Sequence, residues 1–104
     1  MQTGLRVLTG ATAFISAAHR NLNGEVHGHT WEVKAWWQNV PCAVEKQATL
    51  RNYLSIFDHT MLGDDQAWGE ALGKAILHGL DCVKVEVSRP LEGLFASIEM
   101  ELAS

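Results

Sequence analysis

Glu25-Val-His-Gly-His-Thr-Trp31 is a short run in which a single glycine separates two histidines. Side chains alternate between the two faces of a β-strand, so a strand here places His27 and His29 on the same face. Gly28 adds no side chain to the opposite face, where another backbone segment can approach closely. The run therefore predicts a strand that presents two imidazoles side by side.

A third histidine lies at the end of the preceding apolar run. His19 is separated from His27 by the polar segment Asn21-Leu-Asn-Gly24, whose Asn and Gly residues tolerate positive φ and return the chain as an antiparallel hairpin. Three histidine nitrogens with an open fourth position are the pattern of a catalytic zinc site, whereas structural zinc sites are usually closed by four ligands. A plainer interpretation competes with this one. In it, His27 and His29 are half-exposed surface residues and His19 is an ordinary core or loop residue.

Composition limits the classes of protein to be considered. The 104 residues predict a single domain over 1–104 that can bury a core without disulfides. A net charge of −4, with only eight scattered basic residues, argues against a nucleic-acid-binding surface. No secretory signal pattern or bilayer-spanning apolar run is present, which predicts a cytoplasmic protein that does not bind membranes. Cys42 and Cys82 form no Cys-x-x-Cys pair, so we expect both to remain thiols.

Alternating hydrophobicity predicts four strands in two hairpins. The first hairpin combines residues 5–19 and 26–37, and the histidines of the second strand share its apolar face. An unpaired buried imidazole is costly, so histidines on such a face need a metal or a hydrogen-bond network as partner. The second hairpin combines residues 83–87 and 94–102.

Between the hairpins, the hydrophobic period changes to that of helices. A stripe at three- and four-residue spacing predicts an amphipathic helix over 43–57, and residues 64–65 are expected to cap a second helix that ends near Gly79. Gly69 and Gly73 weaken this second helix, which a close approach to the sheet or to a neighbouring subunit would explain. The order ββααββ predicts an α+β fold, an antiparallel four-stranded sheet with both helices on one face.

Three motifs follow one another along the chain: Phe14-Ile-Ser-Ala-Ala-His-Arg20, His27-Gly-His-Thr-Trp-Glu-Val33 and Phe57-Asp-His-Thr-Met-Leu62. In this order they resemble the 6-pyruvoyltetrahydropterin synthase and 6-carboxytetrahydropterin synthase family. The resemblance implies a tunnelling fold, in which sheets from three subunits join into an oligomeric barrel and two rings stack as a homohexamer, with zinc near subunit interfaces. In that family the motif histidines hold Zn²⁺, and they match His19, His27 and His29.

The resemblance also implies an activity. The family's enzymes act on 7,8-dihydroneopterin triphosphate, which points to a zinc-dependent lyase with a pterin substrate, in queuosine-type or in tetrahydropterin or folate synthesis. Zinc suits this chemistry because it acidifies carbon-bound protons and stabilises the developing negative charge. Asp58 and His59 match the family's acid–base pair, in which the aspartate orients the imidazole. Without the resemblance, Asp58 is more simply interpreted as a residue that caps local backbone.

Two positions depart from the family's pattern. Asn23 stands where the family has its catalytic cysteine, four residues before the His-x-His motif. Glu25 is the nearest titratable group and a candidate base, because some relatives use a glutamate and release a hydroxymethylpterin; it can equally be a solvated turn residue. Val87 stands in place of the glutamate that anchors the pterin ring. Glu86 is expected to point to the opposite face, and Glu92 in the following turn is another candidate anchor.

These departures leave two hypotheses open. The first is a zinc-dependent pterin lyase in which His19, His27 and His29 hold zinc and Asp58-His59 transfers protons. The second is a diverged, non-catalytic zinc-binding oligomer of the same fold. The enzyme requires Glu25 or another base near the substrate's side chain, and a carboxylate at the ring end of the pocket.

Overall fold

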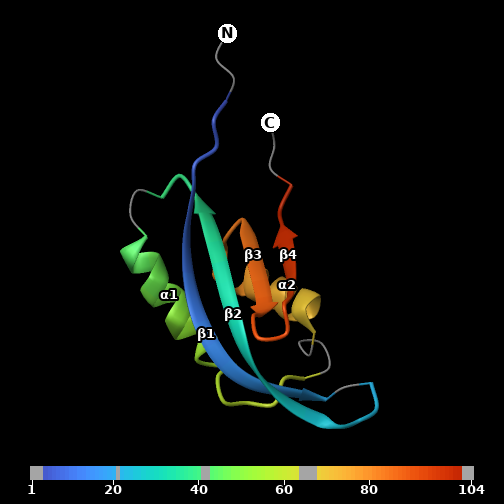
Figure 1. The fold of residues 1–104 in the computed structure, drawn as a ribbon. Coiled ribbons are helices and arrows are strands. Elements are labelled where there is room, and N and C mark those ends of the chain that lie inside the picture. Colours follow the sequence, from blue (N-terminus) through green and yellow to red (C-terminus); the bar gives the residue numbers. More distant parts are fainter. Residues whose placement is uncertain (1–3, 21, 41–42, 64–67, 102–104) are drawn as a thin grey trace.

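The computed structural model describes residues 4–20, 22–40, 43–63 and 68–101 (Figure 1). Its elements are β1 (Leu8–Arg20), β2 (Val26–Gln38), α1 (Val44–Leu54), α2 (Gly69–Leu80), β3 (Lys84–Arg89) and β4 (Leu94–Glu99). The predicted α+β class and the order ββααββ are confirmed. The helix cap expected at residues 64–65 lies outside the described residues.

The four strands form one antiparallel sheet in the order β1-β2-β3-β4. β1 and β2 pair along their whole length, from Leu8 opposite Gln38 to Arg20 opposite Val26. β3 pairs with β2 only between Glu32 and Trp36, so the first hairpin extends well beyond the second (Figure 1). The projecting end of this curved hairpin carries all three motif histidines.

The core lies on one face of the sheet. Alternate residues of β1, β2 and β3 point to this face, and α1 packs mainly on β1 while α2 packs on β3 and β4. The prediction that both helices cover the same face is therefore confirmed. The most deeply buried side chains of this core include Trp31, Val33, Leu50, Leu54, Leu72, Ile76, Val85 and Val87.

The helix ends differ from the predicted ones. α1 ends at Leu54, and turns bonded from Phe57 N to Leu54 O continue the chain where the pattern predicts helix. α2 continues to Leu80, and Asp81 rather than Gly79 adopts the left-handed conformation, with φ of 54°. Gly79 has a different role, because the Tyr53 ring occupies the space that a Cβ at this position would need. Neither described helix is long and apolar enough to cross a membrane.

The close approach of α2 to the sheet explains one of its two glycines. A Cβ at Gly73 would lie 2.8 Å from Cγ1 of Ile98 on β4 and 3.6 Å from Cγ2 of Val87 on β3. A Cβ at Gly69 would be in ordinary contact, 3.6 Å from the Cβ of Ala96. The expected contact with the sheet is thus confirmed for Gly73. This contact holds the start of α2 against β3 and β4, and the Trp68 ring that precedes α2 lies beside His19.

Candidate metal centre and adjacent pocket

Two of the three predicted zinc ligands converge at the projecting end of the hairpin. The register places His19 opposite His27 and Ala17 opposite His29, so all three imidazoles start from the helix-covered face. Nε2 of His19 lies 2.9 Å from Nε2 of His29. Both rings pack edge-on against Trp31, and His19 is only 2% exposed. The two nitrogens therefore meet at a sheltered point next to the core.

A carboxylate fixes the orientation of His29. Oε1 of Glu92, in the turn between β3 and β4, lies 2.7 Å from Nδ1 of His29. A carboxylate accepts hydrogen bonds, so Nδ1–H donates and Nε2 of a neutral His29 keeps its lone pair toward His19. Such a carboxylate contact is the usual outer partner of metal-binding histidines. Glu92, considered above as a ring anchor, is thus engaged in orienting a candidate zinc ligand.

The third predicted ligand does not join the other two. The His27 ring lies parallel to that of His29, with ring centroids 6.2 Å apart and an interplanar angle of 10°. Within the described ranges, no three His, Cys, Asp or Glu side chains gather closely enough to hold a metal ion. His27 is exposed near the start of β2. The three-histidine zinc site consequently stays a prediction, with two of its nitrogens already in contact.

Arg89 also reaches the histidine pair. Its Nη1 lies 3.3 Å from Nε2 of His29 and 3.5 Å from Nε2 of His19, and its guanidinium carbon lies 5.7 Å from the centre of the Trp31 ring. The two imidazoles and the carboxylate behind His29 are a donor set that fits zinc. A permanent cation at this distance would repel the metal, so zinc requires Arg89 to withdraw. Sequence reasoning missed Arg89, although it continues the alternation of Val85 and Val87 on the core face.

The Asp58–His59 pair forms elsewhere, beside the edge strand β1. Oδ1 of Asp58 accepts a hydrogen bond of 2.8 Å from the backbone N–H of Ser16, and Oδ2 lies 3.0 Å from Nδ1 of His59. The Ser16 N–H, and after it the His59 charge, hold the pKa of Asp58 below its ordinary value. Asp58 thus caps backbone of β1, 42 residues away in sequence, rather than the local backbone of its plainer interpretation.

Left-handed backbone at His59, with φ of 59°, turns its side chain outward, where it is 81% exposed. Backbone hydrogen bonds from Ala18 N to Thr60 O and from Leu62 N to Ala18 O fix this segment along β1. Among the described residues, no hydrogen bond or ring contact joins His59 to the motif histidines. Within a single chain, the predicted acid–base pair is therefore separate from the predicted metal ligands.

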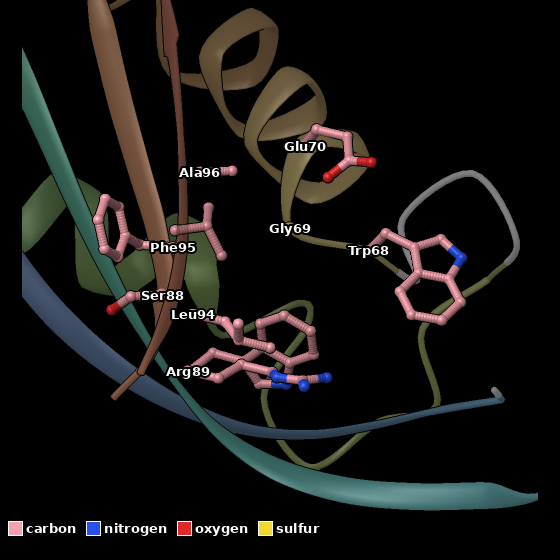
Figure 2. A pocket seen from close by; sticks show the side chains of 10 residues that line it. Trp68, Gly69, Glu70, Ser88, Arg89, Leu94, Phe95 and Ala96 are labelled. Carbon is pink, nitrogen blue, oxygen red and sulfur yellow. The ribbon is translucent and has the colours of Figure 1, made fainter. Parts of the chain in front are cut away.

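A pocket of about 170 Å³ lies between the ends of β3 and β4 and the start of α2 (Figure 2). The strand register directs Arg89 and Leu94 into it, whereas Ser88 and Phe95 project to the other side of the sheet. Trp68 connects the pocket to the histidine pair, because its ring centroid lies 5.0 Å from that of His19. The side chains that face the pocket are Trp31, Trp68, Val87, Arg89, Leu94 and Ala96.

Comparison with known proteins identifies the fold. No family model matches the sequence, and neither does any curated protein. The structure is similar to that of 6-pyruvoyl tetrahydropterin synthase from Caenorhabditis elegans, with a TM-score of 0.60 and 19% sequence identity over 97% of this chain and 100% of that one. The chain has the 6-pyruvoyl tetrahydropterin synthase fold. The subunit fold that the three motifs implied is thereby confirmed.

The residues at and near the position where the family pattern has a cysteine are exposed. Asn23 and Glu25 belong to the turn before β2 and lie at the surface. Cys82 does not replace the cysteine, because it is 2% exposed and burial raises the pKa of its thiol to about 11. Cys42 lies outside the described residues. Glu25 therefore stays a candidate base by position alone.

The second departure concerns the ring end of the pocket. Val87 is buried on the helix-covered face, where its alkyl side chain adds no polar group to the pocket wall. Glu86 points to the opposite face, as predicted, with Oε1 3.8 Å from Nζ of Lys34. Of the residues lining this pocket, Glu70 carries the one carboxylate, and Glu70 is exposed on α2.

Proposed function

We propose that this chain binds zinc through His19, His27 and His29 and acts as a lyase on a pterin, with 7,8-dihydroneopterin triphosphate as the first substrate to test. The observation that supports it best is the 2.9 Å approach of two histidine Nε2 atoms, one of them oriented by Glu92, in a chain with a pterin synthase fold. The proposal includes a homo-oligomer, trimer or hexamer, in the cytoplasm.

The residues around the metal have distinct tasks. Zinc supplies a Lewis acid that polarises substrate oxygens and lowers the pKa of adjacent C–H groups. His19, held in the core, sets the position of the site, and His29 supplies a nitrogen whose direction Glu92 fixes. His27 completes the set from the exposed strand end. Trp31 and Trp68 shield the site from water, which strengthens electrostatic interactions within it.

Proton transfer is assigned to Asp58 and His59. The carboxylate 3.0 Å from Nδ1 orients the imidazole, which suits a general acid–base group. Because the ring points into solvent at the edge of the sheet, it can serve a substrate held on a neighbouring copy of the chain. This is why the oligomer is part of the proposal.

A second candidate function is a non-catalytic zinc-binding oligomer. Three observations favour it: Val87 is buried where a ring-anchoring carboxylate is needed, Asn23 cannot act as a thiolate, and the Cys82 thiol is buried with a raised pKa. In this alternative the metal site is retained for assembly. It predicts zinc binding without turnover.

Mass spectrometry of the products separates the two. Zinc-loaded protein is incubated with 7,8-dihydroneopterin triphosphate beside a His59→Ala variant of equal zinc content. We expect a carboxy-, pyruvoyl- or hydroxymethylpterin from the parent protein and none from the variant. Loss of a hydroxymethylpterin in Glu25→Gln would assign Glu25 as the base. Unchanged substrate would contradict the lyase and support the non-catalytic oligomer.

A further inference from the structure

The pocket beside the histidine pair combines apolar walls with one half-buried cation, Arg89. Trp31, Val87, Leu94 and Ala96 form the apolar part, and Nη1 of Arg89 lies 3.3 Å from Nε2 of His29. An engineered apolar cavity of about 150 Å³ in another protein binds benzene, so about 170 Å³ has room for one aromatic ring. Pockets of this kind bind the ring by apolar contact and fix its orientation by a few polar groups.

Arg89 is incompletely satisfied by the part of the chain that the structure describes. Its Nε is buried and has no hydrogen-bond partner among the described residues. Its Nη1 contacts are imidazole nitrogens rather than a carboxylate, and the described residues offer it no ion pair. A buried donor without an acceptor is destabilising, and a guanidinium has its best match in a bidentate oxyanion. Among possible ligand groups, an anion would match this donor best.

The start of α2 also favours an anion in the pocket. Trp68, the N-cap residue, makes no side-chain capping hydrogen bond, and Gly69 brings the first helical turn to the pocket. Free backbone N–H groups and the helix dipole favour negative charge at this end. Glu70 is the opposing charge, but it is exposed, so solvent screens it.

From these features we infer that the pocket binds a small planar ligand through an oxyanion, carboxylate or phosphate, that pairs with Nε and a terminal nitrogen of Arg89. The ring lies against Trp31 and Leu94. Movement of Arg89 toward the anion withdraws its charge from the two histidine nitrogens. Arg89 is thus a specificity-determining residue that selects anionic over neutral or cationic ring ligands.

The inference rests on the proposed function only because both concern the same site. Binding of the ring ligand can be measured without zinc or turnover. Full-length protein is titrated with benzoate, phenyl phosphate and neutral benzamide, followed by calorimetry and tryptophan fluorescence. We expect at least one anion to bind about tenfold or more tightly than benzamide, since charge-assisted hydrogen bonds are roughly twice as strong as neutral ones. The better of the two anions identifies carboxylate or phosphate as the natural group.

Three variants assign the effect. Arg89→Gln should lose about tenfold or more of the anion affinity, whereas Arg89→Lys should retain part of it because the charge remains. Arg51→Gln on α1, an arginine that does not line this pocket, should bind as the parent does. Equal affinity for benzamide and both anions, or an equal loss in Arg51→Gln, would overturn the inference. Arg89→Lys covers the case in which Arg89→Gln does not fold.

A failed turnover experiment with the triphosphate leaves this binding measurable. Conversely, a ring ligand that binds without regard to Arg89 would overturn the inference while leaving zinc binding and the lyase intact. The two proposals therefore fail separately.

Discussion

Two histidine–carboxylate pairs of similar length lie in very different surroundings. Glu92 and His29 approach to 2.7 Å, with the His29 side chain 14% exposed and its second nitrogen against His19. Asp58 and His59 approach to 3.0 Å, with the His59 side chain 81% exposed. The contact is the same, but the imidazole of the first pair is enclosed and its second nitrogen faces His19. In the second pair it can meet a molecule that arrives from outside.

The difference shows that the position of a histidine in the sheet decides whether it suits metal binding or proton transfer. His29 starts from a strand whose register points it to the covered face, and a turn from another hairpin supplies its carboxylate. His59 follows its own aspartate directly, on backbone that is bonded to the edge of β1. Burial and convergence therefore favour metal binding by the first pair, while exposure favours proton exchange by the second.

The largest effect is expected from His19→Ala, which removes the buried member of the metal centre. Zinc should fall from about one ion per chain to near zero, and cavity formation should lower the free energy of unfolding by about 3 kcal/mol. Metal analysis and denaturant unfolding measure the two effects. His59→Ala and the exposed His78→Ala should keep their zinc. Full zinc in His19→Ala, or loss in His59→Ala, would reverse the roles assigned to the two pairs.

Next in size is Glu92→Gln, which keeps the shape of the side chain but removes the charge behind His29. Loss of such an outer carboxylate typically lowers metal affinity by about 10- to 100-fold. Competition with a zinc chelator measures this. Glu99→Gln on β4 and Asp58→Asn are the matched controls, and both should bind zinc as the parent does. Equal affinity in Glu92→Gln would show that the contact with Glu92 does not orient a metal ligand.

A gain in zinc affinity is expected from Arg89→Met. The substitution removes a cation 3.3 Å from one ligand nitrogen and 3.5 Å from the other, while an unbranched apolar chain still packs on Trp31. Relief of repulsion should raise zinc affinity by roughly tenfold. The same chelator competition detects it, with Arg51→Gln as control. Unchanged or weaker zinc binding would mean that Arg89 does not compete with the metal.

Much of the fold follows from periodicity, because the sheet faces are so unequally buried. Alternation in 26–37 correctly placed the histidines on the face that carries Trp31, Val33 and Ala35, and all three of these residues are at most 1% exposed. The hairpins and the shared helix side follow from the same pattern. Helix ends were less predictable, since Gly79 serves the Tyr53 ring instead of ending the helix. That contact joins segments distant in sequence, so the residues around Gly79 give no indication of it.

The placement of the three motif histidines was predictable, but their neighbours were not. His-x-His spacing and the upstream His19 predict one shared face, because strand geometry alone brings them there. Glu92 and Arg89 reach it through the turn between β3 and β4, whose position depends on how the second hairpin pairs with the first. Whether His27 completes the metal site remains a prediction, which zinc analysis of His27→Ala tests.

The smallest effect concerns the exposed pair and its dependence on pH. The pKa of Asp58 is held below its ordinary value of about 3.8 by the Ser16 N–H and His59, so the charged carboxylate stabilises the fold. That contribution is complete above the ordinary value and is lost as the pH falls through the lowered pKa of the folded protein. Asp58→Asn can still accept from Ser16 but carries no charge, so its deficit in thermal midpoint should be largest near neutral pH and shrink below about pH 4.

Thermal unfolding of parent and Asp58→Asn across this range measures the difference, and the exposed Glu101→Gln serves as control. A deficit that does not change with pH would assign the effect to packing or to the hydrogen bond alone. In that case His59 would lack the charged partner on which its acid–base role depends. A shrinking deficit would show that the aspartate is ionised next to His59 at neutral pH, which is the state that proton transfer at the sheet edge requires.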